Sequence, residues 1–371
     1  MKLLPFLFSL LGLGWLTSCK NSGYQTKNGS VYYKDNLISE ADAATFEALN
    51  GVFARDKRKA YYRGLSISSA NGASFTALDD HFGKDRAAVF YCDNYIDFQL
   101  FNTTRKDKII PIPGADVGSF VAIRNEYAKD KFRCYYKDSG FAVNDVASFE
   151  PLDYGFGKDN QVGYFEFKPI PGSNGSSFGV LSRNFSRDQQ AVYYSWTILD
   201  TPVGKSTSGI RVIHEADPST FTTVGMYYAL DKDHAFYKHN VVEAADLATF
   251  KQWDESTIDY ASDSTHIYYQ DKWIREADKA SFKLVTDNYA QDNKAVFYAG
   301  SIIKEADVTS FTVLESGYAK DDKRVYYNGN LLNGADIASF TLVHNEADRD
   351  AADKKHSYYA GRRFTPEKDL N

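Results

Sequence analysis

The sequence lacks the residue patterns that usually mark an enzyme. It contains no His-Glu-x-x-His zinc pattern and no glycine-rich phosphate loop. Its polar residues recur in phase along the chain, whereas catalysis needs one unique cluster of groups. The sequence therefore predicts a protein with no catalytic activity, no metal and no cofactor.

A hydrophobic run long enough to cross a membrane is also missing. The apolar stretch from Leu3 to Leu16 is interrupted by Gly12 and Gly14 and falls short of the about 20 residues that a spanning helix needs. Because Lys2 precedes it, the stretch predicts a secretory signal peptide over residues 1–18.

The end of this stretch, Leu16-Thr17-Ser18-Cys19, resembles a bacterial lipobox. The resemblance implies cleavage before Cys19, a diacylglyceryl group on its sulfur, and a lipidated tether over residues 19–23. Several acyl chains anchor a protein stably where one chain binds marginally. Lys20 follows the cysteine instead of aspartate, which by resemblance to sorting in two-membrane bacteria implies the outer membrane, on a face left open. An ordinary signal peptide with an incidental cysteine is the alternative.

No strong charge of one sign is present. The formal net charge of −6 argues against a nucleic-acid partner and against electrostatic docking to anionic lipid. What the chain has in excess is aromatic residues, with 27 Tyr and 26 Phe beside 2 Met, and such a bias needs a repeated cause.

That cause is an internal repeat with a basic step of 29 residues, as between Tyr268-Tyr269, Phe297-Tyr298 and Tyr326-Tyr327. Two further markers keep the same phase: a Phe preceded by Ser or Thr, and an Asp five residues before the aromatic pair. The unit reads Ala-Asp-x-x-Ser-Phe-x-x-Leu, then Tyr-Ala-Lys-Asp-x-x-x-Val-Tyr-Tyr, and it resembles the DKNYY family of bacterial repeat proteins over residues 24–364. The resemblance implies a repeat architecture and an envelope location, without a transferable activity.

Each unit predicts a β-hairpin, because two short aromatic and β-branched segments flank a polar tetrad. The Asp suits the turn, and the Ala-Asp-x-x-Ser/Thr-Phe segment predicts one helical turn with Asp as N-cap. A single unit cannot bury its own apolar face, so neighbours must stack. We expect a mainly β, elongated solenoid-like array of about ten units, with a closed propeller-like ring as the alternative and a C-terminal tail over residues 365–371.

Two insertions, near residues 93–113 and 195–214, interrupt the phase. Insertions in solenoids often emerge on one face and carry binding residues, although neutral loop drift explains them equally well.

Neighbours on a strand point to opposite sides, so one ring of each aromatic pair points away from the other. We therefore weigh a row of outward rings that binds a ligand against a ladder of rings that only ties the units together. The second rings that form this candidate binding surface are Tyr62, Tyr91, Tyr136, Tyr194, Tyr237, Tyr269, Tyr298 and Tyr327.

The remaining polar candidates favour structural roles. His234, His266 and His356 share a slot that holds cations in other units, which predicts solvated side chains. Cys92 and Cys134 could form a disulfide only if the first insertion redirects Cys92, because their slots face opposite sides of a strand.

These features predict a lipid-anchored envelope protein that binds a protein or a glycan without catalysis. A structural spacer without a specific ligand is the alternative, and an enzyme that uses the insertions is the least favoured one.

Overall fold

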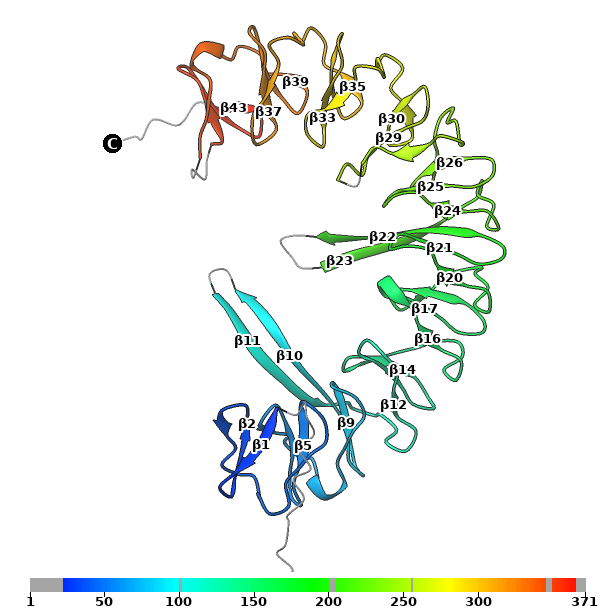
Figure 1. Cartoon of the computed structure of the whole chain (residues 1–371), viewed down its shortest axis with the longest axis vertical. Helices are drawn as coiled ribbons and strands as arrows, with labels where there is room; N and C mark the ends of the chain where they lie inside the picture. Colours follow the sequence, from blue (N-terminus) through cyan, green and yellow to red (C-terminus); the bar gives the residue numbers. More distant parts are fainter. Residues whose placement is uncertain (1–22, 100–101, 201–204, 255, 345–348, 365–371) are drawn as a thin grey trace, which may run out of the picture. The chain divides into compact units, whose positions relative to one another are not determined.

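The structure, a computed structural model, describes residues 23–99, 102–200, 205–254, 256–344 and 349–364. The chain divides into two compact units, Met1–Pro169 and Ile170–Asn371. In the described ranges, one three-stranded and ten four-stranded antiparallel sheets follow one another, each made of consecutive strands (Figure 1). The predicted mainly β repeat fold is therefore confirmed.

The sheets of the first unit are β1 (Tyr24–Lys27), β2 (Ser30–Tyr33) and β3 (Asn36–Leu37); β4 (Glu47–Ala48), β5 (Phe53–Arg55), β6 (Ala60–Tyr62) and β7 (Leu65–Ser66); β8 (Thr76–Ala77), β9 (Phe82–Lys84), β10 (Val89–Gln99) and β11 (Asn102–Pro111); β12 (Val121–Ala122), β13 (Tyr127–Lys129), β14 (Cys134–Tyr136) and β15 (Ser139–Phe141); β16 (Glu150–Pro151), β17 (Phe156–Lys158), β18 (Gly163–Phe165) and β19 (Lys168–Pro169).

The sheets of the second unit are β20 (Gly179–Val180), β21 (Phe185–Arg187), β22 (Val192–Asp200) and β23 (Lys205–Ile213); β24 (Thr222–Thr223), β25 (Tyr228–Leu230), β26 (Ala235–Tyr237) and β27 (Asn240–Val241); β28 (Lys251–Gln252), β29 (Tyr260–Ser262), β30 (Ile267–Tyr269) and β31 (Lys272–Trp273); β32 (Lys283–Leu284), β33 (Tyr289–Gln291), β34 (Val296–Tyr298) and β35 (Ser301–Ile302); β36 (Thr312–Val313), β37 (Tyr318–Lys320), β38 (Val325–Tyr327) and β39 (Asn330–Leu331); β40 (Thr341–Leu342), β41 (Ala351–Ala352), β42 (Ser357–Tyr359) and β43 (Arg362–Phe364).

The predicted hairpin forms the centre of each four-stranded sheet, and one further strand on either side completes it. In the sheet β36-β37-β38-β39, Tyr318 pairs with Tyr327 and Ala319 with Tyr326. The predicted helical turn is a 3-10 helix at η1 (Gly72–Ser74) and η3 (Ile337–Ser339), where Asn71 and Asp336 cap the first turn. A third 3-10 segment, η2 (Asp153–Gly155), lies elsewhere in its repeat and has no such side-chain cap.

The core lies between successive sheets. Tyr326 packs with Tyr289 and Val296 of the preceding sheet, whereas Val325 on the opposite face packs with Tyr358 of the following one. Both faces of a strand are thus covered, and each buried large side chain stabilises the stack by roughly 2 kcal/mol.

The phenylalanine after Ser or Thr links the layers. The Phe75 ring lies 5.7 Å from that of Phe53 and 6.2 Å from that of Phe90, and Phe311 lies 5.9 Å from Tyr289 and 5.7 Å from Tyr326. Rings at these separations attract one another beyond their area of burial.

The two insertions lengthen the third and fourth strands of their sheets. β10 pairs with β11 from Phe90–Pro111 to Gln99–Asn102, and β22 pairs with β23 from Val192–Ile213 to Asp200–Lys205. Each hairpin extends beyond the short strands of its own sheet (Figure 1).

Candidate functional site

An aspartate, buried in most repeats, organises the turn of each described sheet after the first. Asp321, 3% exposed, accepts the N–H groups of Lys323 and Arg324 at Oδ1, and the N–H group of Asp307 and the hydroxyl of Tyr326 at Oδ2. Burial raises the pKa of Asp321, but these hydrogen bonds outweigh it and hold the pKa below its usual value. The predicted turn role is therefore present, with two additional bonds that the sequence did not indicate.

The same backbone bonds recur at every repeat aspartate, and the tyrosine bond recurs where the first ring of the pair carries a hydroxyl. The aspartates are Asp56, Asp85, Asp130, Asp159, Asp188, Asp231, Asp263, Asp292, Asp321 and Asp353. Their oxygens are used within the fold, which accounts for the phased carboxylates without a ligand.

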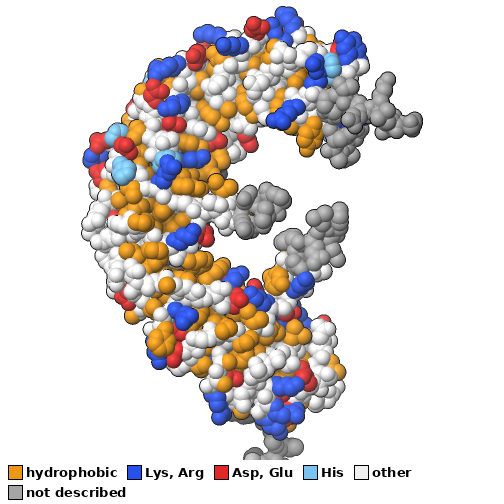
Figure 2. All heavy atoms as spheres, turned by 180° about the vertical axis from the view of Figure 1, so that it is seen from behind, with side chains coloured by type: hydrophobic (Ala, Val, Ile, Leu, Met, Phe, Trp, Pro, Cys, Tyr) orange, Lys and Arg blue, Asp and Glu red, His pale blue; other side chains and the backbone are white. Residues whose placement is uncertain are grey.

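The second rings are covered rather than displayed. Tyr62, Tyr91, Tyr194 and Tyr237 are at most 5% exposed, and Tyr136, Tyr269, Tyr298 and Tyr327 are half-buried. Of the two alternatives, the ladder of covered rings describes these four buried tyrosines, because successive sheets cover both faces of the strand. On the face drawn in Figure 2, hydrophobic side chains are spread among charges of both signs.

A tight turn covers the second ring at an ordinary junction between sheets. After Tyr326-Tyr327, Asn328 and Gly329 both have positive φ, 46° and 73°, as a type I′ turn requires. A Cβ on Gly329 would lie 2.5 Å from Cβ of Tyr298, so only glycine fits. The junction is also joined by Tyr289, whose hydroxyl donates to Gly317 O at 3.0 Å and accepts the Gly329 N–H at 3.2 Å.

The junction that follows Tyr164-Phe165 keeps the positive φ of this turn but has no glycine. Phe167 occupies the turn slot that holds glycine at Gly64, Gly300, Gly329 and Gly361. Its φ is 64°, and within the described ranges it is the one non-glycine residue in that slot with a positive φ. The left-handed conformation costs a side-chain-bearing residue roughly 1–2 kcal/mol, so an outlier of this kind is a reason to look for function.

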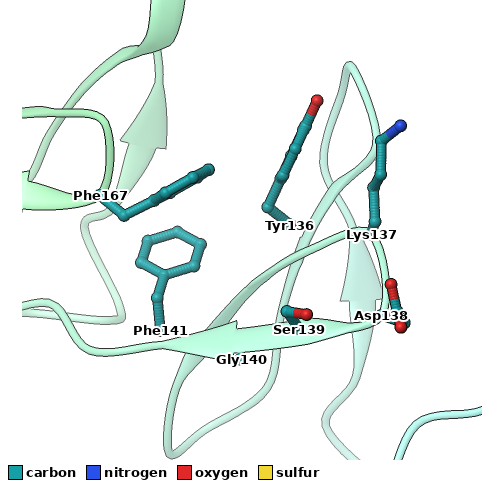
Figure 3. A pocket seen from close by; sticks show the side chains of 7 residues that line it. All are labelled: Tyr136, Lys137, Asp138, Ser139, Gly140, Phe141 and Phe167. Atoms are coloured by element: carbon teal, nitrogen blue, oxygen red, sulfur yellow. The ribbon is translucent and has the colours of Figure 1, made fainter. Parts of the chain in front are cut away.

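The ring of Phe167 opens a cleft between the sheets β12-β13-β14-β15 and β16-β17-β18-β19. Its centroid lies 5.3 Å from that of Tyr136 and 4.9 Å from that of Phe141. Figure 3 shows the Phe141 ring beneath that of Phe167, with the Tyr136 ring to one side of both. The first cavity of the cleft has a volume of about 340 Å³ and is lined by Tyr136, Lys137, Asp138, Ser139, Gly140, Phe141 and Phe167.

A second cavity of about 370 Å³ shares Tyr136 and Phe167 with the first, and the two together are called the Phe167 cleft below. Tyr154, 54% exposed and with a φ of 57°, stands at its edge. The other residues that line it are Asn125, Tyr127, Leu152, Asp153, Gly155 and Glu166.

Tyr127 lines the second cavity and corresponds to Tyr289 of the ordinary junction. Among the residues that the structure describes, the Tyr127 hydroxyl has no hydrogen-bond partner, whereas the Tyr289 hydroxyl has two. Burial raises the pKa of Tyr127 to about 12, so the hydroxyl is neutral and able to donate at ordinary pH.

A cluster of His81, Asp93 and Glu126 lies at the base of the β10–β11 hairpin, with its ligand atoms within 4.8 Å of one another. No sequence motif joins these residues, which come from the turn before β9, from β10 and from the turn before β13. The Lys137 ammonium lies 3.4 Å from Glu126 and 3.9 Å from Asp93, and Tyr91 donates to Glu126. A lysine thus already supplies the positive charge that a metal would bring.

The histidines of the shared slot lie against their aspartates rather than in open solvent. His266 Nδ1 lies 3.0 Å from Asp263 Oδ2, and the His266 side chain is 24% exposed. His234 and His356 occupy the corresponding places beside Asp231 and Asp353. The predicted solvated side chains are therefore partly covered, because each histidine ring lies beside the aspartate of its repeat.

The segment Gly175–Gly179 reads Gly-Ser-Ser-Phe-Gly and matches a nucleophile-elbow pattern, which the sequence analysis overlooked. Ser177 is, however, the serine of the repeat's Ser-Phe step. Its hydroxyl lies 3.1 Å from Asn174 Oδ1 and accepts the N–H of Gln189. The match therefore arises from the repeat.

Cys92 and Cys134 are free, buried thiols, so the disulfide considered from the sequence does not form. Cys92 packs with Phe75 and Phe90 against the preceding sheet, whereas Cys134 packs with Tyr127, Phe149 and Tyr164 against the following one. The insertion extends β10 without turning Cys92 around. Cys19 lies outside the described residues.

The sheets and their aspartate network define a tandem β-repeat protein. The DKNYY family matches residues 24–150, 53–197, 206–318 and 303–362, and the chain belongs to this family. No curated protein and no solved structure matches the chain. None of the helices in the described ranges is long and apolar enough to cross a membrane.

Proposed function

We propose that this protein is a lipid-anchored, non-catalytic binding protein of the bacterial cell envelope, and that the Phe167 cleft is its binding site. The observation that carries the proposal is the backbone of Phe167. Where this turn slot has a positive φ in the other described repeats it holds glycine, whereas here it keeps a large ring in the left-handed region, beside Tyr136. Strain of this kind persists where the surroundings impose it, often at binding sites.

The non-catalytic part of the proposal rests on how the polar side chains are used. The phased aspartates accept backbone and tyrosine hydrogen bonds, and Asp93 and Glu126 at the first hairpin have the Lys137 ammonium as a counter-ion. The anchor rests on the lipobox-like Leu16-Thr17-Ser18-Cys19.

The binding site is tested by chemical cross-linking in whole cells with the full chain. We expect a partner to be cross-linked to the wild type and to Phe132→Ala, which removes a ring that is 65% exposed and outside the cleft. Phe167→Gly should lose it, because the turn then becomes an ordinary one. Equal cross-linking of Phe167→Gly and wild type contradicts the proposal.

The anchor is tested separately by labelling cells with a radioactive fatty acid. The wild type should take up the label and remain in the membrane fraction, whereas Cys19→Ala should do neither. A labelled Cys19→Ala chain contradicts lipidation at this cysteine.

The second candidate is a spacer, favoured by the regular docking of one sheet on the next. If the protein is a spacer, deleting one whole unit of 29 residues, such as residues 292–320, should impair its function strongly. Phe167→Gly should then have little effect. The binding proposal expects the reverse order of effects.

A further inference from the structure

The geometry points to an uncharged sugar ring as the ligand of the Phe167 cleft, an inference that rests on the proposed binding function. The Tyr136 and Phe167 rings pack against each other, with centroids 5.3 Å apart and planes at 36°, and the Phe141 ring packs against Phe167, so a ligand would meet the outward sides of this aromatic cluster (Figure 3). Aromatic faces bind flat groups that have one apolar side and hydrogen-bonding groups at the edge. A pyranose ring has both.

The charges around the cleft are already paired, which disfavours a charged ligand. Asp138 lies 2.9 Å from the Lys108 ammonium, and Asp153 lies 3.7 Å from the Arg124 guanidinium. An ionic ligand would have to break such a pair or add a like charge beside it. A neutral ligand leaves both pairs in place.

A cationic ligand would meet a competitor at the same ring. The Lys137 ammonium lies 5.7 Å from the centroid of Tyr136 and 3.4 Å from Glu126. An anionic ligand would face the carboxylate of Glu166, which lines the second cavity. These two features leave neutral ligands favoured.

Neutral hydrogen-bonding groups stand where sugar hydroxyls would lie. The Tyr127 hydroxyl lines the second cavity and has no partner among the described residues. Ser139 lines the first cavity and Asn125 the second, and both are exposed. A hydroxylated ligand would give the Tyr127 hydroxyl the bond that Tyr289 makes within the fold.

The extent of the cleft favours a compact ligand over an extended peptide. A polyproline-type peptide needs a longer row of exposed rings. The second rings of the neighbouring sheets of this unit, Tyr91 and Phe165, are 0% and 6% exposed. The partly exposed rings of the cleft are therefore flanked by covered ones on either side in this unit, which suits one or two sugar residues.

The test is an array of neutral, acidic and basic glycans probed with the full chain in detergent, followed by calorimetric titration of a neutral oligosaccharide found on it. We expect at least one neutral glycan to bind. Phe167→Gly and Tyr136→Ala should each weaken that binding by about tenfold or more, since each removes one aromatic ring of the cleft. Tyr127→Phe should weaken it less, and Phe132→Ala should leave it unchanged.

Melting curves of each variant show that loss of binding is not loss of folding. Binding only to acidic or basic glycans, or to no glycan, overturns the sugar assignment. If a cross-linked protein partner still depends on Phe167 in that case, the proposed binding function stands while this inference fails.

Discussion

Two junctions between successive sheets, each built from the same repeat motif, differ at one turn. At the ordinary junction Gly329 lies against Tyr298, and the Tyr289 hydroxyl joins the two sheets. At the other, Phe167 stands 5.3 Å from Tyr136, and Tyr127 makes no corresponding bond among the described residues. The cavity of the ordinary junction measures about 310 Å³ and has neither a ring nor a strained residue in the place of Phe167.

The frame around both turns is the same. Tyr164 donates to Asp159 at 2.5 Å, and Tyr326 donates to Asp321 at 2.8 Å. A turn can therefore change its residue without disturbing the sheets, because Asp159 and Phe167 lie in the turns at opposite ends of β18. The difference teaches that stability is distributed over all repeats, whereas specificity is confined to one turn.

Acidification should have the largest effect, because it acts on both junctions at once. Burial raises the pKa of Asp159 and Asp321, but hydrogen bonds lower it further, so each carboxyl titrates below its usual value. Their contribution is present above the unfolded pKa of about 3.9 and is lost as the pH falls through the folded pKa. The melting temperature should therefore be level between about pH 7 and 5 and fall below about pH 4. A constant melting temperature down to about pH 2 contradicts the network.

Removing one aspartate should cost the most among single substitutions. Asp159→Ala and Asp321→Ala should each destabilise their own junction by about 3 kcal/mol, since both leave buried N–H groups and a tyrosine hydroxyl without acceptors. Hydrogen exchange of the flanking strands measures the local loss in a repeat protein. Asp322→Ala, at an exposed neighbouring position, is the control and should change stability by less than about 0.5 kcal/mol. Markedly unequal losses at the two sites would break the idea of a common frame.

Placing a side chain at the ordinary turn should be the next largest effect. Gly329→Ala should cost about 2 kcal/mol, because its Cβ would add a clash with Tyr298 to the strain of a positive φ. Gly114 has a φ of 72° and no atom within 4 Å of its Cβ position, so Gly114→Ala should cost only about 1 kcal/mol. Chemical denaturation of both variants measures the difference, and equal losses would remove the close contact from the account.

The two tyrosine hydroxyls should show the smallest contrast. Tyr289→Phe leaves the Gly329 N–H without its acceptor and should cost about 1 kcal/mol. Tyr127→Phe removes a hydroxyl without a partner in the described structure and should cost less than about 0.5 kcal/mol. Thermal melting compares the variants. A larger loss of stability in Tyr127→Phe than in Tyr289→Phe would contradict this comparison, because it would mean that the Tyr127 hydroxyl makes a stabilising hydrogen bond.

The sequence predicts much of this fold because its markers report local needs. The aspartate needs a turn of N–H groups, and the pair Tyr326-Tyr327 needs a strand, so both can be recognised from spacing. The covering of the second rings could not be predicted, since the direction in which the next sheet docks depends on contacts between repeats. The sequence therefore left Tyr62 and Tyr298 as equal candidates, although one is 3% exposed and the other half-buried.

The residue type at position 167 is a sequence feature that could have indicated the cleft. Outside the two insertions, aligning the turns after each aromatic pair gives glycine or a polar residue in the slot of Phe167, as at Gly64 and Asp138, so a phenylalanine there is unusual. Its meaning still required the structure, because a residue in that slot can avoid a positive φ, as Asp138 does. Sequence spacing does not state which backbone conformation a turn adopts.

The most direct measurement is to determine, on one preparation of Phe167→Gly in the full chain, both its melting temperature and its binding of the cross-linked partner or glycan. Relief of strain and loss of a half-buried ring offset each other, so we predict a stability within about 1 kcal/mol of the wild type together with lost binding. A variant that melts far below the wild type, or that binds as well as it does, would contradict the claim that Phe167 is kept for function.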